Sequence, residues 1–214
     1  GRTQADITGL IGQYAHGNEP SHHIAYLYNS AGAPHKTQQR VKQILEEMYH
    51  NAPDGLSGNE DCGQMSAWYV LSSLGFYPVC PGDPRYVIGY PALDSANIRM
   101  GNGKVFRIRR SGSGPYIDHV ELSGLDHQNN FLRHRDFMQG GKLVFHMSET
   151  PSDWGTTMDR VYLTSVRSSY IEAPVMEYAA SVFFDSTEVR WKNPEGHSVE
   201  LSWLPKGKPD RLMQ

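Results

Sequence analysis

Two short loops contain most of the side chains in this chain that could do chemistry. The first reads AHGNEPSHH, from Ala15 to His23, and the second reads SGNEDCGQ, from Ser57 to Gln64. Each loop contains Gly-Asn-Glu, so an amide and a carboxylate stand on adjacent residues within a turn. Such oxygen donors suit either a hard cation such as calcium or hydrogen bonds to sugar hydroxyl groups. Both loops precede expected helices, whose free backbone N–H groups favour carboxylates.

The same residue types also have ordinary structural uses. Asn, Asp, Glu and Ser just before a helix most often cap it by accepting hydrogen bonds from its first N–H groups. His22 and His23 lie about 100° apart on a helix, so at most one of them can face a given site. Trp68 and Tyr69, which follow the second loop, are more often core residues than platforms for a sugar ring. HExxH is absent, which argues against a metalloprotease.

Composition excludes several classes of partner. The 214 residues carry a formal net charge of -3 and 38% hydrophobic residues, which is typical of an ordinary folded protein. Because the sequence has no block of Lys and Arg long enough to contact a phosphate backbone, we expect no nucleic-acid partner. No apolar run approaches the roughly 20 residues that cross a bilayer, so we expect no membrane span. Cys62 and Cys80 lack zinc-site spacing and are expected to be free buried thiols, although a disulfide stays open.

Three helices are expected to position the loops. Residues 21–32 have apolar side chains at helical spacing and close on Gly32, a suitable C-terminal cap. Residues 35–50 place Val41, Ile44, Leu45 and Met48 on one stripe, which predicts an amphipathic helix. Residues 64–75 are apolar around most of the circumference, which predicts a helix buried on nearly all sides.

The pattern changes to β structure from about residue 82. Short alternating apolar runs occupy residues 86–90, 97–110, 116–124 and 142–148, with a Gly-Asn-Gly turn inside the second run. They predict an antiparallel sheet. Residues 175–193 and 198–205 again alternate and predict strands of a small β module.

Two long blocks carry a family resemblance. GNEPSHHIAYLYN (17–29) and GNEDCGQMSAWYVLSSLGFYPVCPG (58–82) together resemble the two best-marked blocks in the catalytic region of glycoside hydrolase family 92, whose members are exo-α-mannosidases. YVIGYPALDSANIRMGNGKVFRI (86–108) and GGKLVFHM (140–147) resemble the β-rich region that follows in that family. The resemblance extends from residue 1 to about residue 150.

The resemblance implies an α+β organisation in three parts. Residues 1–81 would form the C-terminal helices of an (α/α)6 barrel, and residues 82–170 a β-rich, sandwich-like region that completes the catalytic part. Residues 171–214 loosely resemble the start of a small accessory β module. A β-sandwich and the rest of the barrel are expected upstream.

The resemblance also implies a reaction and a catalytic residue. Family members hydrolyse non-reducing terminal α-mannosidic linkages, often α-1,2, by a calcium-assisted inverting mechanism that pairs a general acid with a general base. Asp61 matches the base position, and Glu60 is a second candidate. Some relatives have another acidic residue where this chain has Asn59. The general acid is expected upstream of Gly1, so the isolated chain is expected to be inactive.

Further site residues follow from the same resemblance. Asn18 and Glu19 are the candidate calcium ligands, while Asn59, His16, and His22 or His23 are expected to line the sugar pocket. Mannose-containing glycans would be the substrate, and secretion or the periplasm the location. Two alternatives stay open, a non-catalytic carbohydrate-binding or structural module and a retaining glycosidase.

Overall fold

The computed structural model describes two separate parts of the chain. One compact unit comprises residues 1–163 and the other residues 164–214. The backbone is described for residues 8–156, 175–183, 186–192 and 198–203, and side chains for residues 8–156. Of the predicted accessory module, residues 171–174, 184–185, 193–197 and 204–214 lie outside the described residues.

The first two predicted helices differ in regularity. The segment after the first loop is broken into two 3-10 turns, η1 (Glu19–Ser21) and η2 (Ile24–Tyr26), and the short helix α1 (Leu27–Ser30). It ends before Gly32, whose φ of 73° requires a left-handed conformation that favours glycine. By contrast, α2 (Pro34–Glu47) is regular, and the prediction of its buried stripe is confirmed because Val41, Ile44, Leu45 and Met48 are all buried.

The third helix, α3 (Gln64–Ser73), is less enclosed than its apolar sequence predicted. Met65 and Trp68 are fully buried, but Tyr69 is 41% and Val70 55% exposed in this chain. The prediction of burial on nearly all sides is therefore wrong here. The physical reason is that α3 packs toward the core through the face that holds Trp68, while on its other side Tyr69 contacts the Tyr49 ring and Val70 stays exposed.

A five-stranded sheet forms the β-rich part of the first unit. Its strands are β5 (Ser95–Arg99), β6 (Val105–Ser111), β7 (Tyr116–Leu122), β8 (Leu125–Asp126) and β10 (Gly141–Ser148), in the order β5-β6-β10-β7-β8. The hairpin β5–β6 turns at the Gly-Asn-Gly sequence, as predicted. The sheet is not wholly antiparallel, however, because β10 lies between β6 and β7 and pairs in parallel with β6.

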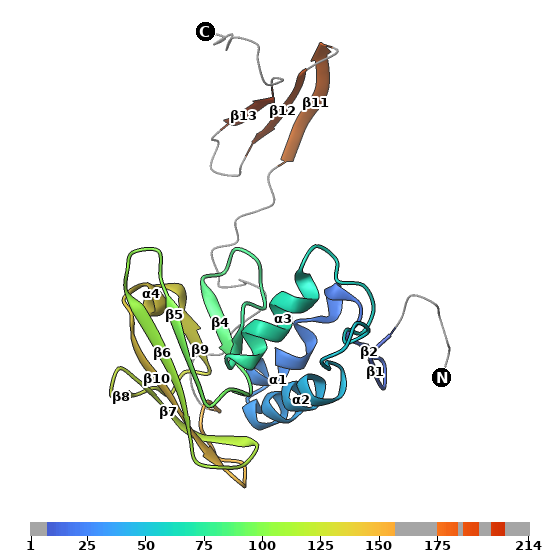
Figure 1. Cartoon of the computed structure of the whole chain (residues 1–214). Coiled ribbons are helices and arrows are strands. Elements are labelled where there is room, and N and C mark those ends of the chain that lie inside the picture. Colours follow the sequence, from blue (N-terminus) through green and yellow to red (C-terminus); the bar gives the residue numbers. More distant parts are fainter. Residues whose placement is uncertain (1–7, 157–174, 184–185, 193–197, 204–214) are drawn as a thin grey trace. The chain divides into compact units, whose positions relative to one another are not determined.

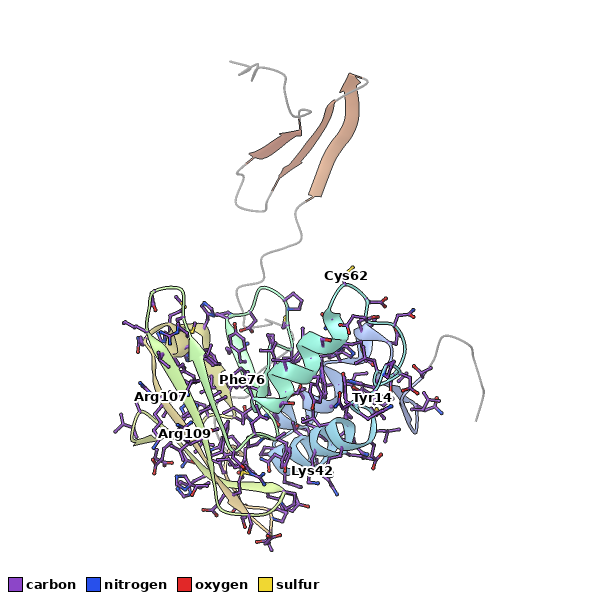
Figure 2. All side chains as sticks on the ribbon, in the orientation of Figure 1. Tyr14, Lys42, Cys62, Phe76, Arg107 and Arg109 are labelled. Carbon is purple, nitrogen blue, oxygen red and sulfur yellow. The ribbon has the colours of Figure 1, made fainter. Side chains whose placement is uncertain are left out.

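One face of this sheet joins the helices in a shared core. Phe106, Ile108, Leu143 and Phe145 are buried on that face and pack in the same cluster as α2 and α3 residues. The link to α2 is also polar, since the Ile117 backbone N–H donates to Gln38 Oε1 at 3.0 Å. Figure 1 shows the helices gathered on this side of the sheet, and Figure 2 shows Arg107 and Arg109 on its other side.

Smaller elements complete the first unit. Strands β3 (Phe76–Tyr77), β4 (Arg85–Ile88) and β9 (Phe131–Arg133) form a three-stranded sheet, and β1 (Leu10–Ile11) pairs with β2 (Tyr14–Ala15) before the first loop. The helix α4 (His134–Met138) was not predicted. It begins with a capping box in which Asp136 accepts a hydrogen bond from the Arg133 N–H at 2.8 Å.

The second unit contains the strands that the sequence predicted for it. β11 (Val175–Phe183), β12 (Ser186–Lys192) and β13 (Ser198–Trp203) form an antiparallel sheet in that order. Together the two units give a chain of mixed α and β structure. None of the described helices has the length and apolar character needed to cross a lipid bilayer.

Candidate active site

The two Gly-Asn-Glu loops lie against each other through their glycines. A Cβ atom added to Gly17 would lie 2.7 Å from the Ser57 carbonyl oxygen, and one added to Gly58 would lie 2.9 Å from the Gly17 carbonyl oxygen. Both distances are shorter than real Cβ contacts, so only glycine permits this approach of the two backbones. The sequence therefore brings two loops that are about 40 residues apart into direct contact through the first residue of each repeat.

A pair of carboxyl groups faces across this contact. Glu19 and Asp61, the predicted calcium ligand and the predicted base, interact through their side chains. Glu19 Oε1 is shielded from solvent and has no donor group among the described residues. Because two carboxylates are both acceptors, their contact is a hydrogen bond only while a proton lies between them.

The contact shifts the pKa values of Glu19 and Asp61 in opposite directions. The hydrogen bond to Glu19 raises the pKa of Asp61 above its usual range, with smaller contributions from desolvation and from the Glu19 charge. The same hydrogen bond lowers the pKa of Glu19. Neighbouring carboxyls behave in this way because two like charges cannot both ionise at close range without cost.

The backbone at Asp61 is strained. Asp61 and Cys62 have φ values of 48° and 59°, and Gly63 follows at 89°, so three successive residues are left-handed. For residues other than glycine such conformations cost roughly 1–3 kcal/mol each and occur preferentially at functional sites. Cys62 is exposed at the tip of this turn (Figure 2) and is not bridged to Cys80, which is partly exposed. The expectation that both thiols are buried is wrong, because the turn directs Cys62 outward.

The neighbours of Asp61 in the second loop have different surroundings. The Glu60 carboxylate accepts hydrogen bonds from the Ser66 backbone N–H at 3.0 Å and the Ser66 hydroxyl at 2.8 Å, in the first turn of α3. Glu60 therefore caps the first turn of α3, which is the structural alternative given for such residues in the sequence analysis. Asn59 is exposed and has its side chain free to meet solvent.

His16 lies on the buried side of the two loops and not on their solvent side. It is completely buried, with Tyr14 Oη 2.7 Å from its Nδ1 and Tyr49 Oη 2.6 Å from its Nε2. The Tyr49 hydroxyl donates to the Met65 carbonyl at 3.3 Å, so it accepts from Nε2–H, and the Tyr14 hydroxyl donates to Nδ1. Burial, reinforced by the neighbouring His22, lowers the pKa of His16 to about 3. His16 is therefore a neutral ring held by two tyrosines.

His22 is the second buried histidine and is held as firmly. Its Nε2–H donates to the His16 carbonyl at 3.0 Å, while its Nδ1 accepts from Gln64 Nε2 at 3.1 Å. The rings of His16 and His22 are stacked with centroids 4.8 Å apart, and Trp68 Nε1 donates to the His22 carbonyl at 3.1 Å. Burial lowers the pKa of His22 as well. His23, half-buried, only precedes η2.

The first loop is closed by its own backbone and one hydroxyl. The Ser21 hydroxyl donates to the Asn18 carbonyl at 2.7 Å and also contacts the Ala15 carbonyl. Asn18 is exposed at the tip, next to Glu19. The two predicted calcium ligands, Asn18 and Glu19, therefore lie on the solvent side of the loop contact, which we call its mouth. His16 and His22 lie on the buried side.

Sequence reasoning missed the residues that support the two histidines. Tyr14 directly precedes the first loop, Gln64 ends the second, and Tyr49 lies between them. Gln64 also donates to Tyr77 Oη at 3.0 Å, so it joins α3 to β3. A polar residue at the first position of an otherwise apolar helix was a usable signal, because Gln64 cannot be buried there without partners.

Comparisons with known proteins agree on one family. Residues 1–149 match the catalytic domain of glycosyl hydrolase family 92. A fungal protein of Arthroderma benhamiae, described as an uncharacterized secreted glycosidase, is 29% identical over 151 residues, which cover 68% of this chain and 20% of that protein.

Solved structures of Bacteroides thetaiotaomicron enzymes are more similar. A family 92 α-mannosidase in complex with mannoimidazole is 42% identical, with a TM-score of 0.68, over 71% of this chain and 20% of its own. A family 92 inverting mannosidase is 41% identical, with a TM-score of 0.64, over 68% of this chain and 20% of its own. The chain thus spans about a fifth of the length of these relatives. It belongs to glycoside hydrolase family 92.

Proposed function

We propose that this chain forms part of an exo-α-mannosidase that hydrolyses non-reducing terminal α-mannosidic linkages, α-1,2 in the first instance, with inversion. The observation that carries the proposal is the carboxyl pair Glu19–Asp61 at the contact between the two Gly-Asn-Glu loops. Relatives that are described as α-mannosidases, one of them inverting, support the substrate class and the stereochemistry. Mannose-rich glycans are the proposed substrates, and the secreted fungal relative supports action outside the cell.

Asp61 is the proposed general base. In an inverting hydrolysis the ionised Asp61 carboxylate removes a proton from water as the water oxygen bonds to the anomeric carbon, and an acid on the opposite face protonates the leaving oxygen. Because Glu19 raises the pKa of Asp61, the ionised form is a stronger base than an isolated aspartate. No acid with that role is assigned to this chain, and in this proposal it comes from another part of the protein.

The mouth of the loop contact fits calcium in its donor chemistry. Glu19 Oε1, shielded and without a donor among the described residues, and the Asn18 amide oxygen are hard oxygen ligands, and the Asp61 carboxylate lies beside Glu19. A divalent cation satisfies two adjacent carboxylates without the proton that they otherwise share. Calcium, when bound there, would supply Lewis-acid contact to sugar hydroxyls. Glu19 and Asn18 are its proposed ligands.

The remaining site residues have positioning roles in this proposal. Asn59, exposed beside Asp61, is free to bond a sugar hydroxyl. His16 and His22 are too deeply buried to meet a sugar in the described structure, so they hold the first loop from behind. Residues 1–81 are proposed to belong to an (α/α)6 barrel, whose other helices would cover the exposed face of α3 with Tyr69 and Val70.

Replacing Asp61 tests the proposed base. In the full native protein, Asp61→Asn should lower kcat on α-1,2-mannobiose by roughly 100-fold or more, because general-base catalysis is worth about that much. Asp54→Asn is the matched control, since Asp54 is exposed and pairs only with His50. It should keep wild-type kcat and KM.

Two further measurements separate the proposal from its alternatives. Chelation should abolish activity and calcium should restore it, and proton NMR should show the inverted anomer of mannose as the first product. Sugar binding that survives Asp61→Asn with no turnover in any full-length form would instead establish a carbohydrate-binding module. Activity that is insensitive to chelation would refute the calcium site, and a retained anomer would refute inversion.

A further inference from the structure

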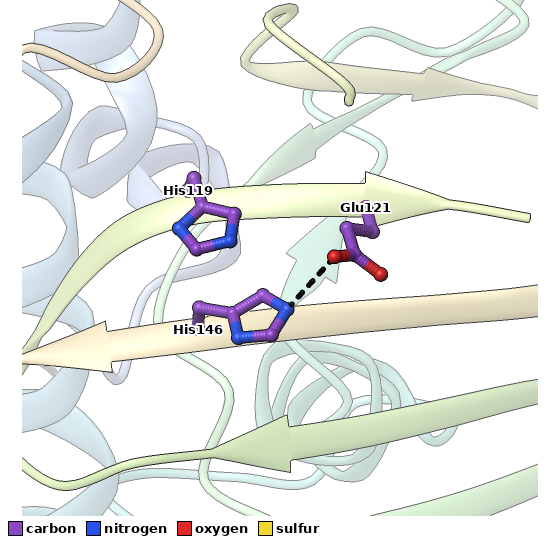
Figure 3. A group of neighbouring side chains, drawn as sticks. All are labelled: His119, Glu121 and His146. Carbon is purple, nitrogen blue, oxygen red and sulfur yellow. Dashed lines mark ion pairs between the residues drawn. The ribbon is translucent and has the colours of Figure 1, made fainter. Parts of the chain in front are cut away.

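A second cluster of ligand side chains lies far from the loops, on the face of the five-stranded sheet that points away from the helices. It consists of His119 and Glu121 on β7 and His146 on β10, and their ligand atoms all lie within 4.8 Å of one another. Among residues 8–156, this is the only group of at least three His, Cys, Asp or Glu side chains that lie closely enough together to share one ion. Figure 3 shows the two rings side by side with the Glu121 carboxylate at their edge.

We propose that His119, Glu121 and His146 bind a divalent transition-metal ion, with zinc as the expected occupant. Two imidazoles and a carboxylate are the ligands of many zinc sites that keep a fourth position for water. Calcium prefers oxygen ligands only, so this site differs in kind from the proposed calcium site. The proposal is independent of the hydrolytic reaction and uses no residue of the loops.

The strand register places the three side chains together. His119 and His146 are directly opposite partners in the antiparallel pair β7–β10, and Glu121 follows His119 by two residues, on the same face. The two imidazole rings stack with centroids 4.0 Å apart and planes 7° apart. Regular pairing of residues 143–146 with residues 119–122, with Val120 and Phe145 fully buried on the opposite face, holds this arrangement.

A β-bulge adds a fourth side chain that prepares His119 for metal binding. The register shifts after His146, so that Asp118 and His119 both lie opposite it and both avoid the core. The Asp118 carboxylate accepts a hydrogen bond from His119 Nδ1 at 2.8 Å. This bond leaves the lone pair of Nε2 free, which is the carboxylate–histidine pattern that supports many metal ligands.

His146 supplies an unused nitrogen at the centre of the cluster. Its Nε2 is shielded from solvent and has no hydrogen-bond partner among the described residues. Glu121 Oε1 lies 3.4 Å from it, close enough for an ion pair but outside hydrogen-bond geometry. A metal ion between the two would use both atoms, whereas the ion pair alone leaves the hydrogen-bonding capacity of Nε2 unmet.

The strands beside the cluster carry charges of both signs. The residue opposite His146 on β6 is the neutral Ser111, and the residue opposite Glu121 on β8 is the acidic Asp126. Arg109, two residues before Ser111 on the same face of β6, donates to the Ile108 carbonyl at 2.9 Å. Because the two ring planes are only 7° apart, one ion can lie in the planes of both rings only after the His146 ring turns about its Cβ–Cγ bond, while Asp118 holds His119 in place. That torsion is broad for histidine, so the movement costs little.

Cobalt provides the direct test, because four-coordinate Co2+ absorbs visible light strongly and occupies zinc sites. The full native protein, stripped of metal and resupplied with excess calcium, should bind one Co2+ with this absorption, and Zn2+ should displace it. His146→Ala and Glu121→Gln should each weaken Zn2+ binding at least 10-fold by calorimetry. Asp118→Asn should weaken it by about 10-fold, as loss of an outer hydrogen bond to a ligating histidine does.

A matched control and the contrary result complete the experiment. His134→Ala removes an exposed histidine of α4 that contacts Tyr86 instead, and it should leave the Zn2+ affinity unchanged. Glu121→Gln keeps the size of the side chain, so its effect does not depend on misfolding. A six-coordinate cobalt spectrum, or Zn2+ affinity that is unaffected by both His146→Ala and Glu121→Gln, would overturn the proposal.

Discussion

At the scale of single residues, two titratable pairs in this chain have opposite environments. Glu19 and Asp61 meet at the contact between the two loops, where the pKa of Asp61 is raised and that of Glu19 lowered, so their charges depend on pH and on any cation that binds there. His16 and His22 lie behind them, stacked and buried, and are held neutral by tyrosine and glutamine partners. The two histidines behind the carboxyl pair are therefore uncharged. Glu19 is thus the charged group that acts most strongly on Asp61.

The buried histidines should make the fold sensitive to acid. The pKa of His16 is about 3 in the folded protein, below its usual 6.5, so the unfolded chain binds a proton more readily. This contribution to stability is complete above about pH 6.5 and is lost progressively as the pH falls toward about 3. The melting temperature should therefore fall between about pH 7 and about pH 4, and His16→Asn should flatten that fall.

The slope, rather than the absolute melting temperature, is the readout for this prediction. His16→Asn also loses packing, which lowers the melting temperature at every pH by a similar amount. His134→Asn, which removes an exposed histidine, should keep the wild-type slope. A slope for His16→Asn equal to that of the wild type would show that His16 is not buried in the neutral form.

At the scale of elements, the loop contact depends on the absence of side chains. The missing side chains of Gly17 and Gly58 let the backbones of the two loops lie in van der Waals contact, and the Gly17 N–H donates to the Thr8 carbonyl at 3.1 Å within the first segment. The position of each loop relative to the other therefore depends on these two glycines.

A single methyl group should disturb this contact. Gly17→Ala places Cβ 2.7 Å from the Ser57 carbonyl and 2.3 Å from Thr8 Oγ1, and a backbone carbonyl cannot move aside cheaply. We expect a loss of stability of about 1–3 kcal/mol and a loss of mannosidase kcat at least as large as the loss of substrate affinity. Thermal unfolding and steady-state kinetics measure the two effects.

Gly101→Ala is the matched control for this substitution. A Cβ at Gly101 meets nothing within 4 Å, and no left-handed φ is required there. It should be nearly neutral in both measurements. Wild-type kinetics and stability for Gly17→Ala would mean that the loops do not touch as described.

Local patterns predicted some of these elements well and others poorly. α2 and the β5–β6 hairpin follow from helical periodicity and a Gly-Asn-Gly turn, which are properties of neighbouring residues. The parallel pairing of β10 with β6 depends on residues about 35 positions apart, and no local pattern specifies it. The contact of Glu19 with Asp61 and the burial of His16 are also long-range, so the residue types were predictable and their partners were not.

At the scale of the whole molecule, the chain spans 20% of the length of the mannosidases that it resembles. An exposed Tyr69 and Val70 on α3 are consistent with further elements that pack there, because adjacent apolar side chains on a helix face rarely stay uncovered. In the proposed reaction, those elements would also supply the general acid.

Residues 1–214 alone should therefore be inactive. In the proposed reaction, a base without its opposed acid loses a contribution of about 100-fold or more. Mannose release from α-1,2-mannobiose by the purified chain, compared with the full native protein at equal concentration, measures this. Release within 10-fold of the full protein would place the acid inside these residues and refute the assignment.

The strand order of the five-stranded sheet also constrains when this unit can fold. β6 and β7 are adjacent in sequence but do not pair, because the last strand, β10, lies between them. During synthesis the inner edges of both strands stay open until residues 141–148 have left the ribosome. An open edge of a strand is a template for pairing with another chain, and contacts distant in sequence form slowly. We therefore expect the sheet to assemble from its outer strands inward, and the pairing of β10 to close the edges that could otherwise pair with another chain.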